Sequence, residues 1–398
     1  MERVELHAHT KMSAMDGLIT PADLVRHAAE LGHKAVAITD HGAVQAFPEA
    51  YQAGKAHGIK IIYGLELMVE SEDVFTVLLI AKNARGLKNL YALVSLSHTA
   101  YFDELTKEPR IPQRVLSAHR EGLLLGSAGV DGECERAAVA GYTEEELASV
   151  ADYYDFVGIR PLDDLKKIHA KIVSACESIG KPVVALGNVQ VLRPEDAILQ
   201  AVLRRGMRES YTKKQPPLHL MTTDEMLAVL SYLGEEKAFE VVVANTNRIA
   251  DMVEEIPPIS EGLFLPQLDN AEEELVRCCN FRLQILNTCN RHVDASGNRE
   301  PSDAAKSRLD AELDSIIRNG YAAVYMIARR LVMEALGDDR CVSTRGSIGS
   351  SFVAYLLGIT DVDPLEYDIP FEAFAGLDGS KPPDISLLFD REYQAVMH

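Results

Sequence analysis

Short β-rich runs alternate with amphipathic helical stretches in the N-terminal half of this 398-residue chain, and the alternation limits the folds available to it. The β-rich runs are VELHAH, KAVAITD, KIIYGLEL, VFTVLLIA, GLLLGS, DFVGIR and KPVVALG, and helical patterns such as PADLVRHAAELG lie between most of them. Strands that alternate with helices indicate βα units and a parallel sheet. We therefore expect an α/β domain over residues 1–206, closed into a distorted barrel of seven strands in place of the usual eight.

The rest of the chain has different patterns. Residues 207–336 are expected to form a helical connector that includes TTDEMLAVLSYLG, where Thr222 or Thr223 can cap the first turn. The proline-containing stretch EEIPPISEGLFLPQLDN interrupts this region near residue 260. Residues 337–398 mix a glycine-serine loop, a helix and a short strand, which indicates a third, α+β segment.

Composition and charge exclude several classes of protein. No apolar run is long enough to span a membrane, and the N-terminus lacks the pattern of a secretion signal, so we expect a cytoplasmic protein without membrane contact. The six cysteines lack C-x-x-C spacing and are expected to be reduced and mostly buried. A net charge of −20 argues against a generic nucleic-acid coat, because such binding depends on Lys and Arg.

Polar side chains stand at the ends of the predicted strands. Alternate residues of a strand share a face, so His7 and His9 would present two imidazoles side by side. Asp40 and His41 follow the second run, and Glu66 ends the YGLE segment of the third. Because ligands gather at the carboxyl ends of parallel strands, we expect convergence on one rim. With a loop aspartate and the histidine that ends LYALVSLSH, the candidate metal ligands are His7, His9, Asp16, His41, Glu66 and His98.

Mixed imidazole and carboxylate ligands favour zinc, manganese or iron. A carboxylate shared by two ions is the usual device for hydrolysing phosphate esters, and Glu66 is the natural bridging ligand. The residues alone therefore point to a metal-dependent phosphoesterase. Taken singly, each residue also fits an ordinary hydrogen-bonded or surface position, so the inference depends on their convergence.

A second candidate site lies near the C-terminus. In the segment RGSIGSS, backbone N–H groups and hydroxyls could cradle a phosphate, with Arg345, Gly346 and Ser347 as the substrate-binding residues. An ordinary turn is the alternative. Further on, PPDIS places Asp384 where its carboxylate could hold a magnesium ion.

Long segments of the chain resemble PolC-type DNA polymerase III, the C-family replicative polymerase of many Gram-positive bacteria. They include VELHAHTKMSAMDG, AITDHGAVQAFPEAY, KIIYGLE, STRGSIGSSFVA and GSKPPDIS, in the order of the family. The resemblance covers nearly the whole sequence. It implies a PHP (polymerase and histidinol phosphatase) barrel, then a helical connector, then an incomplete polymerase palm. It also implies DNA synthesis in replication as the family role, with DNA and replication proteins as partners.

Departures from the family pattern limit what we expect of the PHP rim. The proofreading exonuclease that follows YGLE in the family and the four-cysteine zinc insert after ITDVDPL are both missing. The family's rim cysteine and histidine are replaced by Gly129 and Gln190, and Asn188 stands where the wider superfamily has aspartate. Glutamine is a poor ligand for these ions, so we expect a partly occupied or structural metal site instead of a trinuclear one.

The palm segment departs further. C-family polymerases hold two magnesium ions with the aspartates of a PDID motif and a later aspartate, and such ions assist phosphoryl transfer. This chain has Asp384 as its candidate catalytic residue but Ser386 in place of the second aspartate, and the sequence ends before the third. We therefore expect that it does not polymerise DNA on its own.

Two functions remain open at this point. The first is a truncated or degenerate relative of the polymerase, with a metal-binding barrel and a structural, binding or regulatory role in replication. The second is an active metal-dependent phosphoesterase or nuclease of the PHP superfamily. In the second, His7, His9 and Glu66 hold one ion, and the other rim residues help to place more. The two hypotheses differ in whether the rim holds two ions close together.

A third hypothesis concerns DNA binding. The segment LRRGMRESYTKK is the clearest basic stretch, although charge runs are commonly solvated helix faces. Its candidate phosphate contacts are Arg204, Arg205, Arg208, Lys213 and Lys214. If these contacts exist, affinity for DNA falls steeply with salt.

Overall fold

The computed structural model describes the chain from residue 2, apart from residues 14–15, 130–131, 207–216, 261–263, 290–301, 375–381, 392 and 394–398; at 163 and 204–206 it describes only the backbone. The chain divides into two compact units, Met1–Glu261 and Gly262–His398, which we treat separately. The division falls inside the proline-containing stretch predicted to interrupt the helical region. In the described part of the chain, no helix has the length and apolar character needed to cross a membrane.

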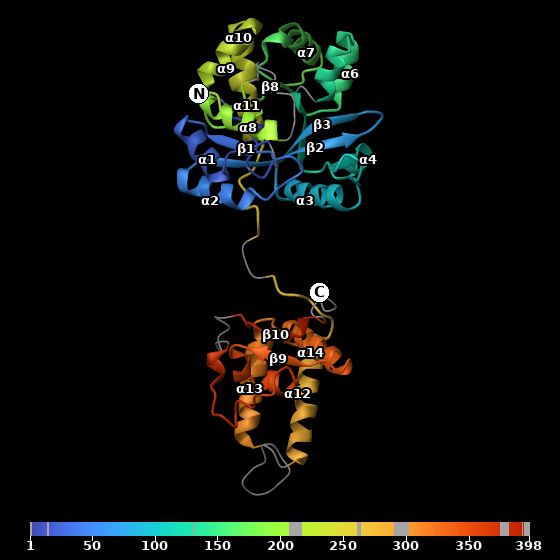
Figure 1. The fold of residues 1–398 in the computed structure, drawn as a ribbon, viewed down its shortest axis with the longest axis vertical. Helices are drawn as coiled ribbons and strands as arrows, with labels where there is room; N and C mark the ends of the chain where they lie inside the picture. The colour runs from blue at the N-terminus through green and yellow to red at the C-terminus, as the bar shows by residue number, and fades with distance from the viewer. Residues whose placement is uncertain are drawn as a thin grey trace. The chain divides into compact units, whose positions relative to one another are not determined.

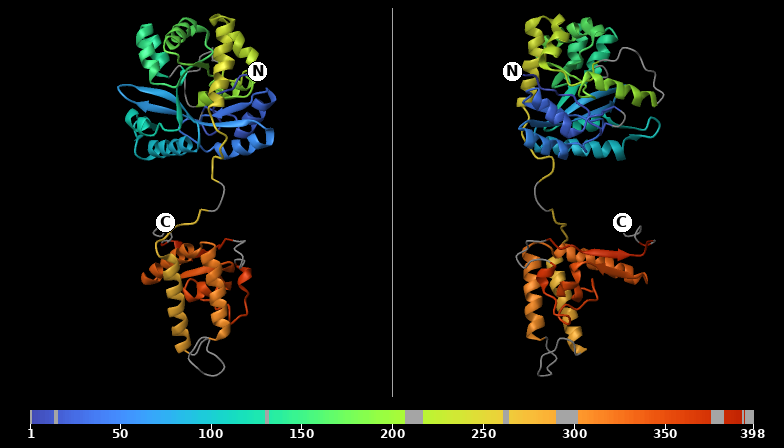
Figure 2. Two further views of the ribbon diagram at one scale, coloured as in Figure 1. Left: turned by 180° about the vertical axis from the view of Figure 1, so that it is seen from behind. Right: turned by 60° about the vertical axis from the view of Figure 1, so that its left-hand side comes forward.

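The first unit is an α/β structure with an eight-stranded mixed sheet and helices around it (Figure 1, Figure 2). Its strands are β1 (Ala35–Ile38), β2 (Lys60–Glu70), β3 (Val74–Ala81), β4 (Phe102–Asp103), β5 (Glu108–Pro112), β6 (Leu123–Ser127), β7 (Phe156–Ile159) and β8 (Val183–Ala185). The first helices are α1 (Pro21–Glu30), α2 (Phe47–His57), α3 (Ala84–Thr99), α4 (Gln113–Ala118), α5 (Glu133–Val139) and α6 (Glu144–Asp152). They are followed by α7 (Lys166–Ser178), α8 (Ala197–Gly206), α9 (Thr223–Leu230), α10 (Glu235–Phe239), a π-helical turn η5 (Glu240–Ala244) and α11 (Asn245–Asp251).

The expectation of a parallel sheet was wrong for β3. The strands β1 and β2, β6 and β7, and β7 and β8 pair in parallel, whereas β3 is antiparallel to both β2 and β6. Only residues 71–73 connect β2 to β3, and a parallel crossover needs a much longer connection. The sequence shows no helical pattern between KIIYGLEL and VFTVLLIA, so this hairpin was open to prediction. The short strands β4 and β5 were not predicted.

The predicted first strand, VELHAH, joins the sheet through single bridges. Glu5 pairs in parallel with Val36 of β1, and Ala8 pairs in parallel with Val189, which follows β8. The His9 N–H donates to the Val189 carbonyl at 2.7 Å, and the Val189 N–H donates to the His7 carbonyl at 2.9 Å. The N-terminal segment therefore lies between β1 and the residues that follow β8.

A buried ion pair fixes this segment. Arg3 and Glu5 are both 0% exposed and form an ion pair with each other. The second oxygen of Glu5 accepts the backbone N–H groups of His7 (2.9 Å) and Gly187 (3.0 Å), and Arg3 donates to the carbonyl of Met221 (3.1 Å). Buried charges are tolerated when they are paired and hydrogen-bonded in this way. The pair connects the N-terminus to the segment after β8 and to the start of the later helices.

Those later helices pack on the first unit. Met226 and Leu230 of α9 and Val242 of η5 belong to the same hydrophobic core as the sheet. Ile249 of α11 packs in a second cluster with Ile62 and other strand residues. The compact unit therefore extends past residue 206, and the boundaries at 206 and 336 stay predictions about sequence segments.

The second unit is built from three long helices and a small sheet. Its elements are α12 (Ala271–Thr288), α13 (Asp303–Arg318), α14 (Ala322–Gly337), β9 (Val342–Arg345), the 3₁₀ turn η6 (Ser347–Ser350), α15 (Phe352–Leu356), the 3₁₀ turn η7 (Phe371–Ala373) and β10 (Ser386–Phe389). The strands β9 and β10 are antiparallel. Leu275, Tyr325 and Phe352 lie at the centre of its core. The six cysteines are free, as predicted, and Cys134, Cys176 and Cys279 are buried.

A buried carboxylate holds the glycine-serine loop of the second unit. Glu312 of α13 is 0% exposed and accepts the N–H groups of Phe352 (2.9 Å) and Val353 (3.0 Å) and the hydroxyl of Ser351 (2.9 Å). Arg308 pairs with it at 2.5 Å. Burial raises the pKa of Glu312, although these donors act in the opposite direction. The inner side of the loop is therefore fixed by one side chain.

We predict that Glu312→Ala lowers the free energy of unfolding of the second unit by about 1 to 3 kcal/mol, because the buried N–H groups of Phe352 and Val353 lose their acceptor, whereas the partly exposed Arg308 keeps the carbonyls of Ser350 and Ile369. Urea denaturation followed by circular dichroism measures the change. Asp310→Ala, at an exposed position of the same helix, is the matched control and should have little effect. Equal effects of the two substitutions would contradict this account of the loop.

Candidate metal centre

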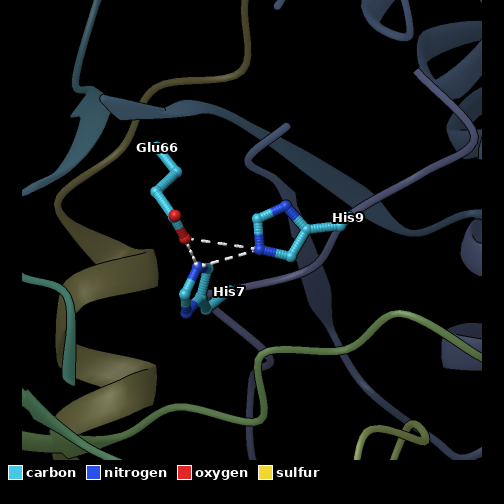
Figure 3. A group of neighbouring side chains, drawn as sticks. All are labelled: His7, His9 and Glu66. Carbon is cyan, nitrogen blue, oxygen red and sulfur yellow. Dashed lines mark hydrogen bonds and ion pairs between the residues drawn. The ribbon is translucent and has the colours of Figure 1, made fainter. Parts of the chain in front are cut away.

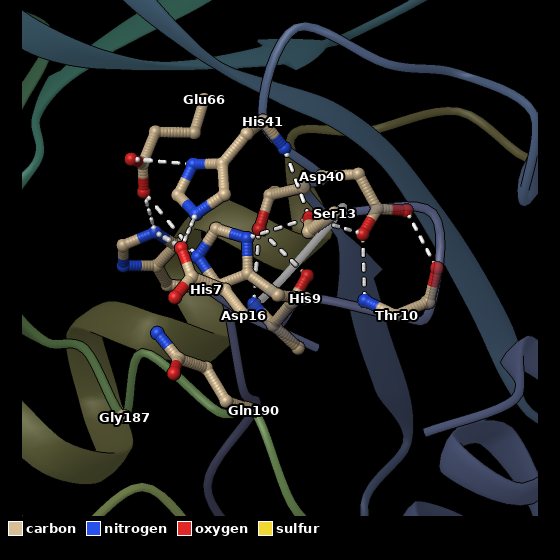
Figure 4. Close-up of polar contacts among 12 residues, drawn as sticks. His7, His9, Thr10, Ser13, Asp16, Asp40, His41, Glu66, Gly187 and Gln190 are labelled. Atoms are coloured by element: carbon tan, nitrogen blue, oxygen red, sulfur yellow. Dashed lines mark hydrogen bonds and ion pairs between the residues drawn. The ribbon is translucent and has the colours of Figure 1, made fainter. Parts of the chain in front are cut away.

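Five side chains predicted for the rim converge in the first unit. His7 and His9 come from the N-terminal segment, Asp16 from the loop that follows it, His41 from the end of β1 and Glu66 from β2 (Figure 4). They meet because the N-terminal segment lies beside β1, which lies beside β2. His41 and Glu66 are themselves bridged in parallel.

Three of these residues form a compact donor set (Figure 3). His7 and His9 direct their Nε2 atoms toward each other at 3.1 Å, and both approach the same oxygen of Glu66, His9 at 3.4 Å and His7 more closely. The three donor atoms all lie within 4.8 Å of one another. Among the described residues, no other group of three His, Cys, Asp or Glu has this arrangement.

The donor set fits a small divalent ion. Tetrahedral coordination at about 2.0 to 2.1 Å places neighbouring ligand atoms about 3.3 Å apart. The His7–His9 and His9–Glu66 separations are close to this value, whereas His7 and Glu66 lie closer together. Two imidazoles and a carboxylate suit zinc, manganese or iron. Burial and the nearby His41 lower the pKa of His9 to about 4, so its ring is neutral at pH 7 and offers a lone pair.

His41 lies between two carboxylates at the edge of this set. Its Nδ1 is 2.9 Å from Glu66 and its Nε2 is 3.0 Å from Asp16. Burial alone would lower the pKa of His41, but the two carboxylates outweigh it and raise the pKa to about 10. Burial likewise raises the pKa of Glu66, while His41 and His7 outweigh it and hold the pKa well below its usual range. At neutral pH the cluster therefore combines an imidazolium with two carboxylates.

Asp40 has a supporting position. It is 0% exposed and accepts the N–H of Thr10 at 2.6 Å and the hydroxyl of Ser13 at 2.6 Å. Ser13 in turn contacts Nδ1 of His9 at 3.2 Å and accepts the N–H of His41 at 3.0 Å. Such contacts orient a metal-binding histidine through its second nitrogen. Sequence analysis missed Thr10 and Ser13, because hydroxyl residues in a loop carry no distinctive signal.

His98 lies beside the cluster on α3. Its Nε2 is 2.8 Å from the carbonyl of Gly42, and no contact with the ligand atoms of His7, His9 or Glu66 is found among the described residues. Gly42 has a φ of +55°, so the turn after His41 requires the conformational freedom of glycine. A role of His98 as a ligand stays a prediction.

Gln190 lies on another side of the cluster (Figure 4) and is hydrogen-bonded to a second buried glutamine. Gln190 is 4% exposed, and the amide of Gln200 in α8, 3% exposed, donates to its carbonyl oxygen. Gln200 also donates to the backbone carbonyl of Asp16 at 3.2 Å. These amides are neutral and link α8 to the loop that carries Asp16. Sequence analysis missed Gln200, which belongs to no motif.

A cleft of about 630 Å³ opens beside the donor set and is called the hairpin cleft here. Asp16, His41 and Glu66 line one part of it. Its other lining residues include the apolar Leu67, Met68, Val74 and Pro109 and the charged Glu108 and Arg136. Of the three donors, Glu66 lines the cleft, whereas the side chains of His7 and His9 are buried.

In the second unit, Arg345, Gly346 and Ser347 are exposed at the end of β9, and Asp384 is exposed just before β10. The antiparallel register places Ser386 opposite Arg345. The substrate-binding candidates at the end of β9 and Asp384 just before β10 therefore lie at adjoining ends of a strand pair. The predicted DNA contacts at Arg208, Lys213 and Lys214, and the side chains of Arg204 and Arg205, lie outside the described residues.

Comparisons with known proteins agree with this division of the sequence. The family model of the PHP domain matches residues 5–159, and that of the bacterial DNA polymerase III alpha NTPase domain matches residues 283–398. The first unit thus carries a PHP region and the second a region of bacterial replicative polymerases. The chain is a relative of PolC-type DNA polymerase III.

Three curated relatives carry that name. The protein of Clostridium perfringens is 35% identical over 86% of this chain and 27% of its own length. The Bacillus subtilis protein is 36% identical over 80% of this chain and 25% of its own length, and the Halalkalibacterium halodurans protein is 28% identical over 100% and 45%. The chain therefore spans less than half the length of these relatives.

Two solved structures are also similar to the chain. An amidohydrolase from Chromobacterium violaceum has a TM-score of 0.33 at 14% identity and covers 55% of this chain and 93% of its own. A putative metal-dependent phosphoesterase from Bifidobacterium adolescentis has a TM-score of 0.23 at 15% identity and covers 74% and 98%. No conclusion is drawn from TM-scores this low.

The raised pKa of His41 predicts a pH dependence of stability in the metal-free protein. The folded state keeps a proton that the unfolded chain releases above pH 6.5, so the contribution of His41 is complete below pH 6.5 and is lost as the pH rises toward 10. After chelator treatment of both, the melting temperatures of the unaltered protein and of His41→Gln should differ most at pH 6 and should converge by pH 10. A difference that grows with pH would contradict the assignment. The partly exposed His27→Gln is the control.

Proposed function

We propose that the first unit binds one divalent ion through His7, His9 and Glu66 and hydrolyses a phosphate ester in the hairpin cleft. The observation that carries this proposal is a set of three donors beside an open cleft of about 630 Å³. Structural zinc sites normally have four protein ligands and are closed, whereas catalytic sites keep three protein ligands and an open position. The geometry therefore favours chemistry over a purely structural role.

The residues around the donor set suit this reaction. When bound, such an ion supplies Lewis acidity and makes hydroxide available near neutral pH. His41 carries a positive charge beside the cleft, held between Glu66 and Asp16, and stabilises the negative charge that develops on a phosphoryl group. Ser13 fixes the ring of His9 through Nδ1, so that Nε2 stays directed at the donor set.

A single ion is favoured over a cluster of ions. Both carboxylates that might bridge to a second ion, Asp16 and Glu66, are paired with His41. The neutral amides of Gln190 and Gln200 fill the adjacent side and offer little charge to hold a cation. A single-ion site of this kind would agree with the partly occupied site expected from the sequence.

We also propose that the sheet of the first unit closes into a distorted barrel. Glu5 is bridged to β1, and Ala8 is bridged to Val189 beyond β8, so the N-terminal segment connects the two ends of the strand series. Closure would bring the carboxyl ends of the strands to one rim, where ligands bind in such folds.

A second candidate function is a non-hydrolytic role in DNA replication, in the cytoplasm, with DNA and replication proteins as partners. The observation in its favour is the exposed loop around Arg345, Gly346 and Ser347, which leads to the start of α15, where Glu312 accepts the N–H groups of Phe352 and Val353. Ser386 removes one of the two carboxylates expected at the palm, so Asp384 alone would bind magnesium weakly and DNA synthesis is not expected.

The first test is the metal content of the purified protein. Elemental analysis should find about one zinc, manganese or iron per chain, and His9→Ala and Glu66→Ala should remove it. Hydrolysis of bis(p-nitrophenyl) phosphate with added manganese should fall at least about 100-fold in both variants. His57→Ala, at an exposed position of α2, is the matched control and should retain metal and activity. Two ions per chain would contradict the single-ion site. A purified protein without bound metal would contradict the proposal as a whole.

The palm segment gives a separate prediction. Residues two apart in an extended segment point to the same side, so Ser386→Asp should add a second carboxylate beside Asp384. Calorimetric titration should then show magnesium binding strengthened about tenfold over the unaltered chain, which itself should not extend a DNA primer. Primer extension by the unaltered chain would contradict the proposed loss of polymerase activity.

A further inference from the structure

The hairpin cleft has a basic residue at a fixed distance from the donor set. In the β2–β3 register Glu66 is opposite Leu78 and Glu70 is opposite Val74. Arg136 of α5 donates from one guanidinium nitrogen to the carbonyl of Val74. Four residues of β-strand span about 13 Å, so the guanidinium is held about 13 Å along the hairpin from Glu66.

The charge of Arg136 is available to a ligand. Its side chain is 46% exposed, and its ion-pair partner, Asp73, is 4.0 Å away and 84% exposed. A pair of this kind is screened by water and contributes little. The bond to the Val74 carbonyl orients the guanidinium without neutralising it. Among the described residues that line the cleft, Arg136 and His41 are the basic ones.

The part of the cleft between these two charges is largely apolar. Leu67, Met68 and Pro109 contribute to its lining. Glu108 also lines the cleft, but Arg110 pairs with it at 3.1 Å. The cleft therefore suits a molecule with one anionic group at the donor set, a second anionic group at Arg136 and apolar surfaces between them, such as the faces of nucleobases, that pack against this lining.

We propose that Arg136 is a specificity-determining residue that binds a second phosphate of the substrate, so that the cleft prefers short single-stranded oligonucleotides over isolated phosphate esters. Arginine is suited to this role because its planar fork binds phosphate through two parallel hydrogen bonds. Phosphates of one duplex strand advance about 3.4 Å along the axis and lie further apart in an extended strand, so about 13 Å spans roughly two or three nucleotides.

The kinetic test of this inference rests on the proposed hydrolysis. A binding measurement tests the inference independently. Tetrathymidylate supplies a distant phosphate, and bis(p-nitrophenyl) phosphate does not. We expect Arg136→Gln to lower the ratio of kcat/KM for the oligonucleotide to kcat/KM for the small ester about tenfold, through KM. Arg85→Gln, exposed and paired with Glu121 outside the cleft, is the matched control and should leave the ratio unchanged.

Fluorescence anisotropy with labelled tetrathymidylate provides the second readout. The slope of log affinity against log salt should be smaller by about 0.7 in Arg136→Gln, as expected for one lost phosphate contact on a single strand. Arg136→Lys keeps the positive charge and should retain most of this slope.

The outcomes separate the two proposals. If the protein hydrolyses neither substrate but binds the oligonucleotide through Arg136, the proposed hydrolysis is wrong and this inference stands. If both substrates are hydrolysed and Arg136→Gln changes neither the ratio nor the salt slope, this inference is wrong. Equal loss of activity on both substrates would also overturn it, because Arg136 would then only support the hairpin through Val74.

Discussion

The buried ion pair between Arg3 and Glu5 is the interaction on which the first unit depends. It lies in the N-terminal segment, where charged or polar residues at positions 3, 5, 7 and 9 alternate with the buried apolar Val4, Leu6 and Ala8. Glu5 accepts the N–H groups of His7 and Gly187, so the carboxylate that stabilises the fold also sets the position of the first candidate ligand. The buried carboxylate of Glu5 therefore supports both the fold of the first unit and the candidate metal centre.

The charge states in the centre depend on how many carboxylates lie beside each histidine. Glu66 faces three histidines, yet His9 is neutral and His41 is charged, because His41 alone has a second carboxylate, Asp16, within 3.0 Å. Such unequal neighbours separate the roles of chemically identical side chains.

Much of this arrangement was open to prediction from the sequence. The alternation of β-rich runs and helices located most strands of the first unit. The spacing of His7 and His9 and the expected position of Glu66 at the end of the third strand predicted their convergence, although β2 continues past Glu66 to Glu70. The antiparallel β3 was missed, although its three-residue connection excludes a crossover. Gln200 and Arg136 could not be found, since their roles arise from tertiary contacts that no local pattern encodes.

Arg3 lies far in the sequence from one of its hydrogen-bond acceptors, and this separation has a consequence for synthesis of the protein. The carbonyl of Met221, which accepts from Arg3, is synthesised 218 residues after Arg3. Domains tend to fold in order during translation, and contacts between distant residues form slowly because the intervening loop must close first. The side chain of Arg3 therefore lacks this acceptor until residue 221 has been made, whereas the bridge of Glu5 to Val36 of β1 can form much earlier.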